Sequence, residues 1–237
     1  MKIAGSVALV TGANRGIGRR FAEQLLERGA TKVYATARHP ERVDLPGAEV
    51  LKLDITDPDS VAAAAAAASD VTLLVNNAGI ATFQNLVTGD LAKIRLEMDT
   101  HFFGTLAVVR AFAPVLGGNG GGAIVNVLSA LSWFSYDGSN AYAAAKAAQW
   151  SLTNGVRIEL AGQGTLVTGV HLGAADTDIM AGYEGDKIDP ADAARAALDG
   201  VEAGRLEVLV DEWSATIKST LAADPGAFYT DVVSATR

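Results

Sequence analysis

Residues 123–150 have the sequence AIVNVLSALSWFSYDGSNAYAAAKAAQW and predict a strand, a loop and a helix. The apolar run at 124–128 is typical of a short buried strand, which ends at Ser129. The helix after the loop carries Tyr142 and Lys146, which are four residues apart and therefore share a face. Because Ser129 stands at the end of a strand, its side chain can point at the same face. The stretch therefore predicts a cluster of three polar side chains.

This cluster is suited to proton transfer. An ammonium group beside a phenol favours the phenolate, and so lowers a pKa that is about 10 in isolation. We therefore expect Tyr142, with Lys146 beside it, to give or take a proton near neutral pH. Taken alone, the stretch fits equally well an amphipathic helix on which Tyr142 packs and Lys146 extends along the surface.

The composition restricts the class of protein. With 237 residues, 25 of them glycine, and almost half of them hydrophobic, the chain is long enough for one well-packed domain, which we expect to span residues 1–237. The formal net charge of -8 disfavours nucleic acids and anionic membranes as partners. We see no signal peptide and no apolar run that suits a bilayer, so we expect a cytoplasmic protein.

Metal and thiol chemistry is not expected. The chain has no cysteine, and its three histidines, His39, His101 and His171, are scattered without the spacing of metal ligands. We therefore expect no metal site.

A glycine-rich turn follows the first predicted strand, at residues 7–10. The turn, Thr11-Gly12-Ala13-Asn14-Arg15-Gly16-Ile17-Gly18, leads directly into a helix. The backbone N–H groups and the dipole of that helix favour an anion, and Gly12, Gly16 and Gly18 let the main chain approach a pyrophosphate. The spacing differs from the commoner G-x-G-x-x-G fingerprint, and a plain tight turn is the simpler alternative.

The end of the second strand bears on which cofactor is bound. A site for NAD usually has an acid there, about 20 residues after the turn, to hold the ribose 2'-hydroxyl. Ala37 takes this place, Arg38 is next to it, and Arg15 lies in the turn. Two guanidinium groups without a carboxylate favour the 2'-phosphate of NADP(H), although each arginine alone would suit a solvated surface.

Predicted strands and helices alternate along the whole chain. Further strands are expected at 50–53, 71–75, 167–172 and 207–210, and one long helix at 91–116. This order predicts an α/β fold of the Rossmann-like doubly wound type, with a mostly parallel sheet of about seven strands flanked by helices. Asp54 ends the third strand, where it suits an adenine amino group or a turn equally well. Asn76-Asn77-Ala78-Gly79 ends the fourth strand, where the amides can join neighbouring loops.

These motifs together resemble the short-chain dehydrogenase/reductase family of single-domain enzymes. The resemblance rests on Thr11-Gly12-x-x-x-Gly16-Ile17-Gly18, Asp54, Asn76-Asn77-Ala78-Gly79, Ser129 and Tyr142-x-x-x-Lys146, in this order and spacing. It implies hydride transfer between NADP(H) and a carbonyl or alcohol. Tyr142 would be the general acid or base, Lys146 would support it and bind the nicotinamide ribose, and Ser129 would bind the substrate oxygen.

The resemblance also implies a set of cofactor contacts. These are Gly12, Asn14, Arg15, Gly16, Ile17, Gly18, Arg38, Asp54, Ile55, Asn77, Ala78, Gly79, Tyr142, Lys146 and Thr177. A homodimer or homotetramer is the family expectation. His101 stands where the family usually has an asparagine that supports a proton relay, so we weigh a catalytic role for His101 against a packed histidine.

The leading hypothesis is an NADPH-dependent carbonyl reductase for a bulky apolar ketone or aldehyde. A substrate loop is expected at 174–187, and the residues expected on the substrate side, besides Ser129, are Trp133, Phe134, Tyr136, Met180 and Tyr183. For each aromatic residue a core position is an equal alternative. The competing functions are oxidation of a sterol-like or sugar-like alcohol and NADP(H)-dependent regulation without turnover.

Overall fold

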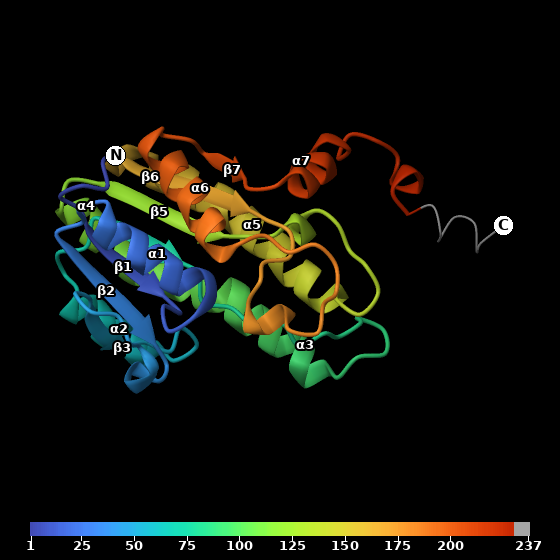
Figure 1. The fold of residues 1–237 in the computed structure, drawn as a ribbon, viewed down its shortest axis with the longest axis horizontal. Helices are drawn as coiled ribbons and strands as arrows, with labels where there is room; N and C mark the ends of the chain where they lie inside the picture. The colour runs from blue at the N-terminus through green and yellow to red at the C-terminus, as the bar shows by residue number, and fades with distance from the viewer. Residues whose placement is uncertain (230–237) are drawn as a thin grey trace.

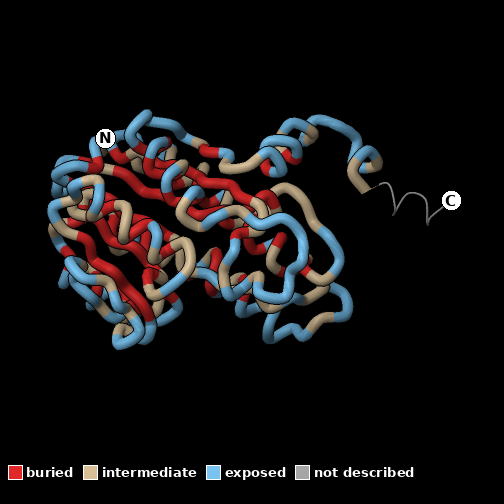
Figure 2. The backbone as a smooth tube through the Cα atoms, in the orientation of Figure 1, coloured by how far each residue is buried: buried red, intermediate tan, exposed pale blue. Residues whose placement is uncertain are grey.

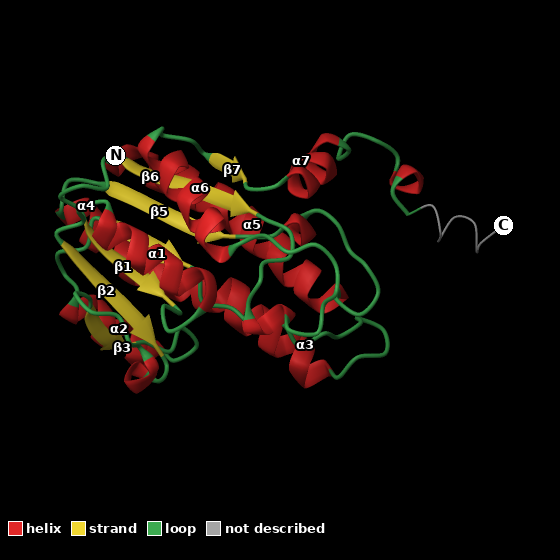
Figure 3. Ribbon diagram, viewed as in Figure 1, coloured by secondary structure: helices red, strands yellow, loops and turns green. Residues whose placement is uncertain are grey.

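The described residues form three layers, a parallel sheet with helices on both faces (Figures 1 and 3). The computed structural model describes residues 1–229, so the last eight residues of the expected domain, 230–237, lie outside the described part. The seven strands have the order β3-β2-β1-β4-β5-β6-β7, and all neighbouring pairs are parallel. The predicted doubly wound fold is therefore confirmed.

The strands are β1 (Val7–Thr11), β2 (Lys32–Ala37), β3 (Glu49–Lys52), β4 (Leu73–Asn76), β5 (Gly122–Val127), β6 (Thr165–His171) and β7 (Glu207–Leu209). The helices are α1 (Gly16–Glu27), α2 (Pro58–Ala67), α3 (Leu91–Met98), α4 (Thr105–Gly118), α5 (Asn140–Leu160), α6 (Pro190–Glu202) and α7 (Glu212–Ser219). A π-helical segment, η2 (Asp99–Gly104), joins α3 to α4. The short 3-10 turns are η1 (Pro40–Arg42), η3 (Ala130–Ser132), η4 (Ala161–Gln163), η5 (Asp178–Met180) and η6 (Pro225–Ala227).

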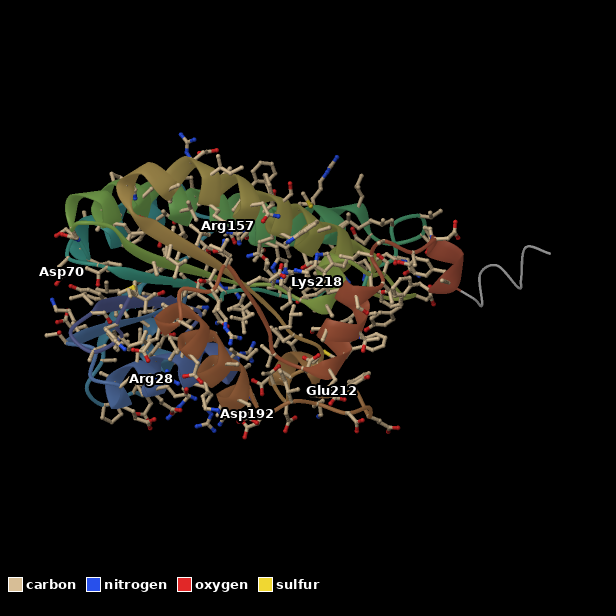
Figure 4. The ribbon with its side chains drawn as sticks, turned by 90° about the horizontal axis from the view of Figure 1, so that it is seen from above. Arg28, Asp70, Arg157, Asp192, Glu212 and Lys218 are labelled. Atoms are coloured by element: carbon tan, nitrogen blue, oxygen red, sulfur yellow. The ribbon has the colours of Figure 1, made fainter. Side chains whose placement is uncertain are left out.

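Each face of the sheet has its own hydrophobic core. On one face α1 and α6 bury side chains such as Phe21 and Leu198 against the strands. On the other face α2, α4 and α5 contribute residues such as Phe112 and Val156. Figure 2 shows the strands buried between these layers, and in Figure 4 Arg28, directly after α1, lies on the opposite side of the sheet from Arg157 of α5. Burial on both faces explains why the strands are continuous apolar runs.

The predicted long helix at 91–116 is interrupted. Residues 99–104 adopt the wider π-helical turn, which is rare and often occurs at functional sites. Gly104 lets this segment approach the third strand's end, because a Cβ atom there would come within 2.9 Å of the Ile55 side chain. By length and composition alone the stretch Leu91–Gly118 could span a membrane, but it packs along the sheet here, with 39% of its most apolar window buried.

The order of the strands determines where a ligand can bind. Connections from β1 lead to one side of the sheet and connections from β4 to the other, so a crevice opens between the C-terminal ends of these two strands. The glycine turn, the 76–79 segment and Ser129 all follow strands at this edge.

Candidate active site and cofactor cleft

A cleft of about 1110 Å³ runs along the C-terminal ends of the strands. It brings together nearly all the residues that the sequence singled out. Those that line it are Gly12, Asn14, Arg15, Gly16, Ile17, Arg38, Asp54, Ile55, Asn77, Ala78, Gly79, His101, Ser129, Phe134, Tyr136, Tyr142, Lys146, Thr177, Met180 and Tyr183. Gly18 and Trp133 do not line it. The lining also includes residues that the sequence patterns did not single out, among them Arg42, Phe83 and Trp213.

The glycine turn has the geometry of an anion site. Gly12 and Gly16 have φ angles of +68° and +54°, in the left-handed region that favours glycine. Gly18 is required for a different reason, since a Cβ atom there would lie 2.2 Å from the carbonyl oxygen of Gly12. Arg15, at the N-cap of α1, makes no side-chain capping bond, so the first N–H groups of this 12-residue helix remain available to a phosphate.

The loops after β1 and β4 are joined by hydrogen bonds. The Thr11 hydroxyl accepts from the N–H groups of Asn77 and Ala78, at 2.9 Å each. The side-chain amide of Asn77 donates to the carbonyls of Thr11 (3.0 Å) and Gly12 (3.3 Å). The predicted role of the amides in joining loops is therefore confirmed for Asn77, and Thr11 is its partner.

The end of the cleft beside β2 is basic. Ala37 ends the strand, and Arg38, His39 and Arg42 line the cleft there. Asp54 also lines it, and its carboxylate accepts from the N–H (3.0 Å) and hydroxyl (2.7 Å) of Thr56, so the turn interpretation of Asp54 holds. The Arg15 guanidinium bonds to the exposed Asp178 carboxylate at 2.6 Å, which links the glycine turn to the 174–187 loop.

Tyr142, Lys146 and Ser129 converge as the sequence predicts. Tyr142 and Lys146 project from α5, and Ser129 follows β5 at the N-cap of η3, against which α5 packs. The Ser129 hydroxyl accepts from the N–H of Leu131 at 3.1 Å and contacts the carbonyl of Leu172 at 3.4 Å. These bonds hold the hydroxyl at the floor of the cleft.

Lys146 is buried, and its amino group is held by two acceptors. Its Nζ donates to the carbonyl of Val127 (2.8 Å) and to Oε1 of Gln149 (2.9 Å). The amide nitrogen of Gln149 donates in turn to the hydroxyl of Thr105 on α4, at 2.9 Å. Gln149 was not among the residues that the sequence motifs predict for the site. Its signal was a polar residue one helical turn after Lys146 in an otherwise alanine-rich segment.

The electrostatics of Tyr142 differ from the expectation. Burial raises the pKa of its phenol, the Glu97 carboxylate raises it further, and the Ser129 hydroxyl acts in the opposite direction. Lys146 does not offset this, because its Nζ is turned toward Val127 and Gln149 and lies 5.6 Å from the centre of the Tyr142 ring. Burial also lowers the pKa of Lys146 to about 7. In this state Tyr142 is a neutral phenol that holds its proton.

His101 lies directly beside Tyr142. The two rings meet edge to face, with their centres 5.2 Å apart. Nε2 of His101 is 2.9 Å from the carbonyl oxygen of Ile80. The absence of a side chain at Gly79 makes room for the imidazole, since a Cβ atom there would lie 2.7 Å from Cε1 of His101. The buried Glu97, one helical turn earlier, is a neighbour of His101 that no sequence motif predicted.

The substrate side of the cleft is aromatic, with one correction. Phe134, Tyr136, Met180 and Tyr183 line it as expected. Trp133 instead packs behind Ser129, with its ring stacked on His171 at 3.7 Å and at an angle of 15°. His171 in turn contacts the carbonyl of Ser129 through Nδ1 at 3.0 Å. The loop turns Trp133 inward because the buried face of His171 offers it a flat apolar contact.

Comparison with known proteins identifies the family. The family model described as short chain dehydrogenase matches residues 6–187, and the chain therefore belongs to this family of oxidoreductases. A 3-oxoacyl-(acyl-carrier-protein) reductase from Vibrio cholerae is 34% identical over 221 residues, which cover 87% of this chain and 86% of the relative.

Two solved structures are similar over nearly the whole chain. A short-chain dehydrogenase from Burkholderia cenocepacia in complex with NADP is 41% identical, with a TM-score of 0.93 and coverage of 98% of each chain. A short-chain dehydrogenase from Sphingobium yanoikuyae in complex with NADPH is 26% identical, with a TM-score of 0.82 and coverage of 95% of each chain.

The lowered pKa of Lys146 predicts how stability depends on pH. Between about 7 and 10.5 the unfolded chain holds more protons on Lys146 than the folded protein does, so this residue makes the free energy of unfolding rise with pH across that window. Lys146→Met should flatten the rise, whereas Lys93→Met, at an exposed position, should keep it. Urea unfolding of the ligand-free proteins at several pH values measures this. An unchanged slope in Lys146→Met would contradict the assignment.

Proposed function

We propose that the protein reduces a bulky apolar ketone or aldehyde to an alcohol, with NADPH as the hydride donor. The observation that carries this proposal is the convergence of Ser129, Tyr142 and Lys146 on one cleft whose other half contains the uncapped N-terminus of α1. Bound NADPH would supply the hydride. The chain orients the cofactor and the carbonyl compound, and it supplies a proton. Proton transfer from a positioned acid raises the rate by about 10² to 10⁴.

The protonation state of Tyr142 favours reduction. A reduction leaves negative charge on the former carbonyl oxygen, which needs a proton from an acid within reach. Burial holds the proton on Tyr142, and the Ser129 hydroxyl beside it can donate to the same oxygen. Lys146, whose amino group is held by Val127 and Gln149, would bind the ribose hydroxyls of the cofactor. Oxidation of an alcohol would need Tyr142 to start as the phenolate, which burial opposes.

The shape of the cleft supports NADP(H) as the cofactor. A Cβ atom at Gly12 would lie 3.0 Å from the backbone of Ala78, and one at Gly16 would lie 3.1 Å from the Thr177 side chain. The glycines thus keep the turn free of side chains at the N-terminus of α1, which suits a pyrophosphate. Arg38 and Arg42 line the end of the cleft beyond β2, where no carboxylate ends the strand, which suits a 2'-phosphate. The similar structures from Burkholderia cenocepacia and Sphingobium yanoikuyae hold NADP and NADPH.

The substrate side supports a bulky apolar compound. Phe83, Tyr136, Tyr183 and Trp213 line the cleft and remain between 44% and 53% exposed, so they offer aromatic surface that a ligand can cover. Phe134 also lines the cleft. Its ring is stacked on Tyr229 with ring centres 5.3 Å apart, and this contact holds Phe134 in place at one side of the cleft. These side chains offer mainly apolar contact surface and few hydrogen-bonding groups. Such a surface suits an apolar carbonyl compound.

We extend the proposal to a cytoplasmic homodimer or homotetramer. Phe103 in η2 and Ile158 on α5 remain 55% and 79% exposed. Apolar surface of this kind is suited to contact with a second subunit.

The reaction can be tested with a panel of carbonyl compounds. Absorbance loss of NADPH should show turnover of aryl ketones and aldehydes well above that of small polar ones. Tyr142→Phe should abolish turnover, by at least about 10²-fold, while cofactor binding measured by titration calorimetry remains. Turnover retained in Tyr142→Phe, or a panel without any substrate, would contradict the proposal.

Cofactor preference can be tested by binding. NADPH should bind at least about tenfold more tightly than NADH, because charge-assisted bonds to the 2'-phosphate contribute roughly 1.5–3 kcal/mol. Arg38→Ala should weaken NADPH binding and leave NADH binding unchanged. Arg195→Ala, an ion-paired arginine on α6, is the matched control and should change neither. Equal affinity of the wild type for both cofactors would refute the role of the arginines.

A further inference from the structure

A second acidic group lies buried next to the site, and the proposed reaction gives it no role. Glu97 is 0% exposed, on α3. Its Oε1 accepts from the N–H of Thr82 at 2.5 Å, and its Oε2 is 3.2 Å from Nε2 of His101. A fully buried carboxylate lowers stability unless it is hydrogen-bonded or paired. The hydrogen bond from Thr82 and the charge contact with His101 therefore allow it to be retained, and within residues 1–229 Oε2 makes no hydrogen bond.

The neighbours of His101 determine which of its nitrogens carries the proton. The carbonyl oxygen of Ile80 and the carboxylate of Glu97 both face Nε2, and both are acceptors. Nε2 must therefore be protonated. In the neutral ring this leaves Nδ1 with a free lone pair. Nδ1 is buried, and within residues 1–229 it has no hydrogen-bond partner.

The π-helical segment places this imidazole at the cleft. His101 lines the cleft and contacts the ring of Tyr142 edge on. Three titratable groups face His101. Tyr142 and Lys146 face it from α5, and Glu97 faces it from α3. The loop after β4 contributes two backbone groups, the carbonyl of Ile80 and the N–H of Thr82.

We propose that Glu97 is a positioning residue that acts through His101, holding its Nε2–H form so that Nδ1 exchanges a proton with the hydroxyl of Tyr142, directly or through one water. The inference rests on the proposed function. When Tyr142 has given its proton to the product oxygen, the proton that restores it leaves Nδ1 of a His101 imidazolium. That ring takes its proton at Nδ1 from a solvent hydronium ion, which becomes water. Transfer of the Nδ1 proton to the Tyr142 phenolate returns His101 to its neutral Nε2–H form, so each turnover consumes one solvent proton.

The charges around the pair are consistent with this role. Burial raises the pKa of Glu97, but the bonds from His101 and the Thr82 N–H outweigh it, so the pKa is lowered and the carboxylate stays ionised. Burial and the Lys146 charge lower the pKa of His101, whereas Glu97 raises it. Glu97 thus keeps the imidazole able to accept a proton although burial and the Lys146 charge disfavour its protonated form. The carboxylate of a carboxylate–histidine pair has the same effect.

The first test needs no turnover. ¹⁵N-histidine spectra of the ligand-free protein should show His101 as the Nε2–H tautomer near neutral pH. His171, whose Nδ1 faces the carbonyl of Ser129, should show the opposite tautomer and serves as an internal reference. Glu97→Gln should lower the pKa of His101. A Nδ1–H tautomer of His101 in the wild type, or an unchanged titration in Glu97→Gln, would overturn the proposal even if no substrate were found.

The second test is a double-mutant cycle on carbonyl reduction. Glu97→Gln should reduce kcat at least about tenfold and shift the pH profile in the wild-type background. In the His101→Asn background the same change should have almost no effect, because Glu97 acts only through the imidazole. Asp199→Asn, in the exposed pair with Arg28 away from the cleft, is the control and should leave the profile unchanged.

The cycle distinguishes positioning from structural support. If Glu97 only anchors the 80–82 segment through the Thr82 N–H, its loss will cost the same in both backgrounds and leave the pH profile unshifted. That result would refute the proposal and leave the proposed function intact. If Tyr142→Phe loses turnover while Glu97→Gln has the same effect on kcat in both backgrounds, the proposed function likewise stands and the positioning role of Glu97 is refuted.

Discussion

The bond between the amino group of Lys146 and the carbonyl of Val127 holds the site together. It ties α5 to the end of β5, and so sets Tyr142 against Ser129. A buried amino group needs such partners, because burial without them would cost several kcal/mol. Gln149 supplies the second partner and extends the network to Thr105 on α4. The position of the proton donor thus depends on polar groups in the core of one face of the sheet.

The rest of the cleft follows from the topology. Parallel strands end at one edge, and the order of the sheet reverses between β1 and β4, so the glycine turn and the 76–79 segment meet there. Their hydrogen bonds through Thr11 and Asn77 fix the cofactor half. The π-helical segment then brings His101 to the other side of Tyr142, with Glu97 behind it. Tyr142 therefore lies between a basic group on its own helix and an imidazole on a neighbouring one.

The sequence predicted the fold and most of the cleft because these depend on local patterns. Apolar runs, the glycine turn that leads into a helix, and the spacing of Tyr142 and Lys146 all carry over into the structure. What it missed depends on which way side chains point. Trp133 turns inward onto His171, and Lys146 turns toward Gln149 and away from the phenol. The burial of Glu97 depends on the π-helical turn, for which the sequence offered no pattern.

The central claim is that this cleft transfers hydride from NADPH to a carbonyl carbon while Tyr142 supplies the proton. The most direct measurement follows deuterium from NADPH labelled at either C4 position, with an aryl ketone as acceptor and mass spectrometry of the alcohol. The account predicts that the carbinol carbon gains deuterium from one of the two labelled cofactors only, and that Tyr142→Phe yields none. Alcohol without label from either cofactor, or equal labelling from both, would contradict it.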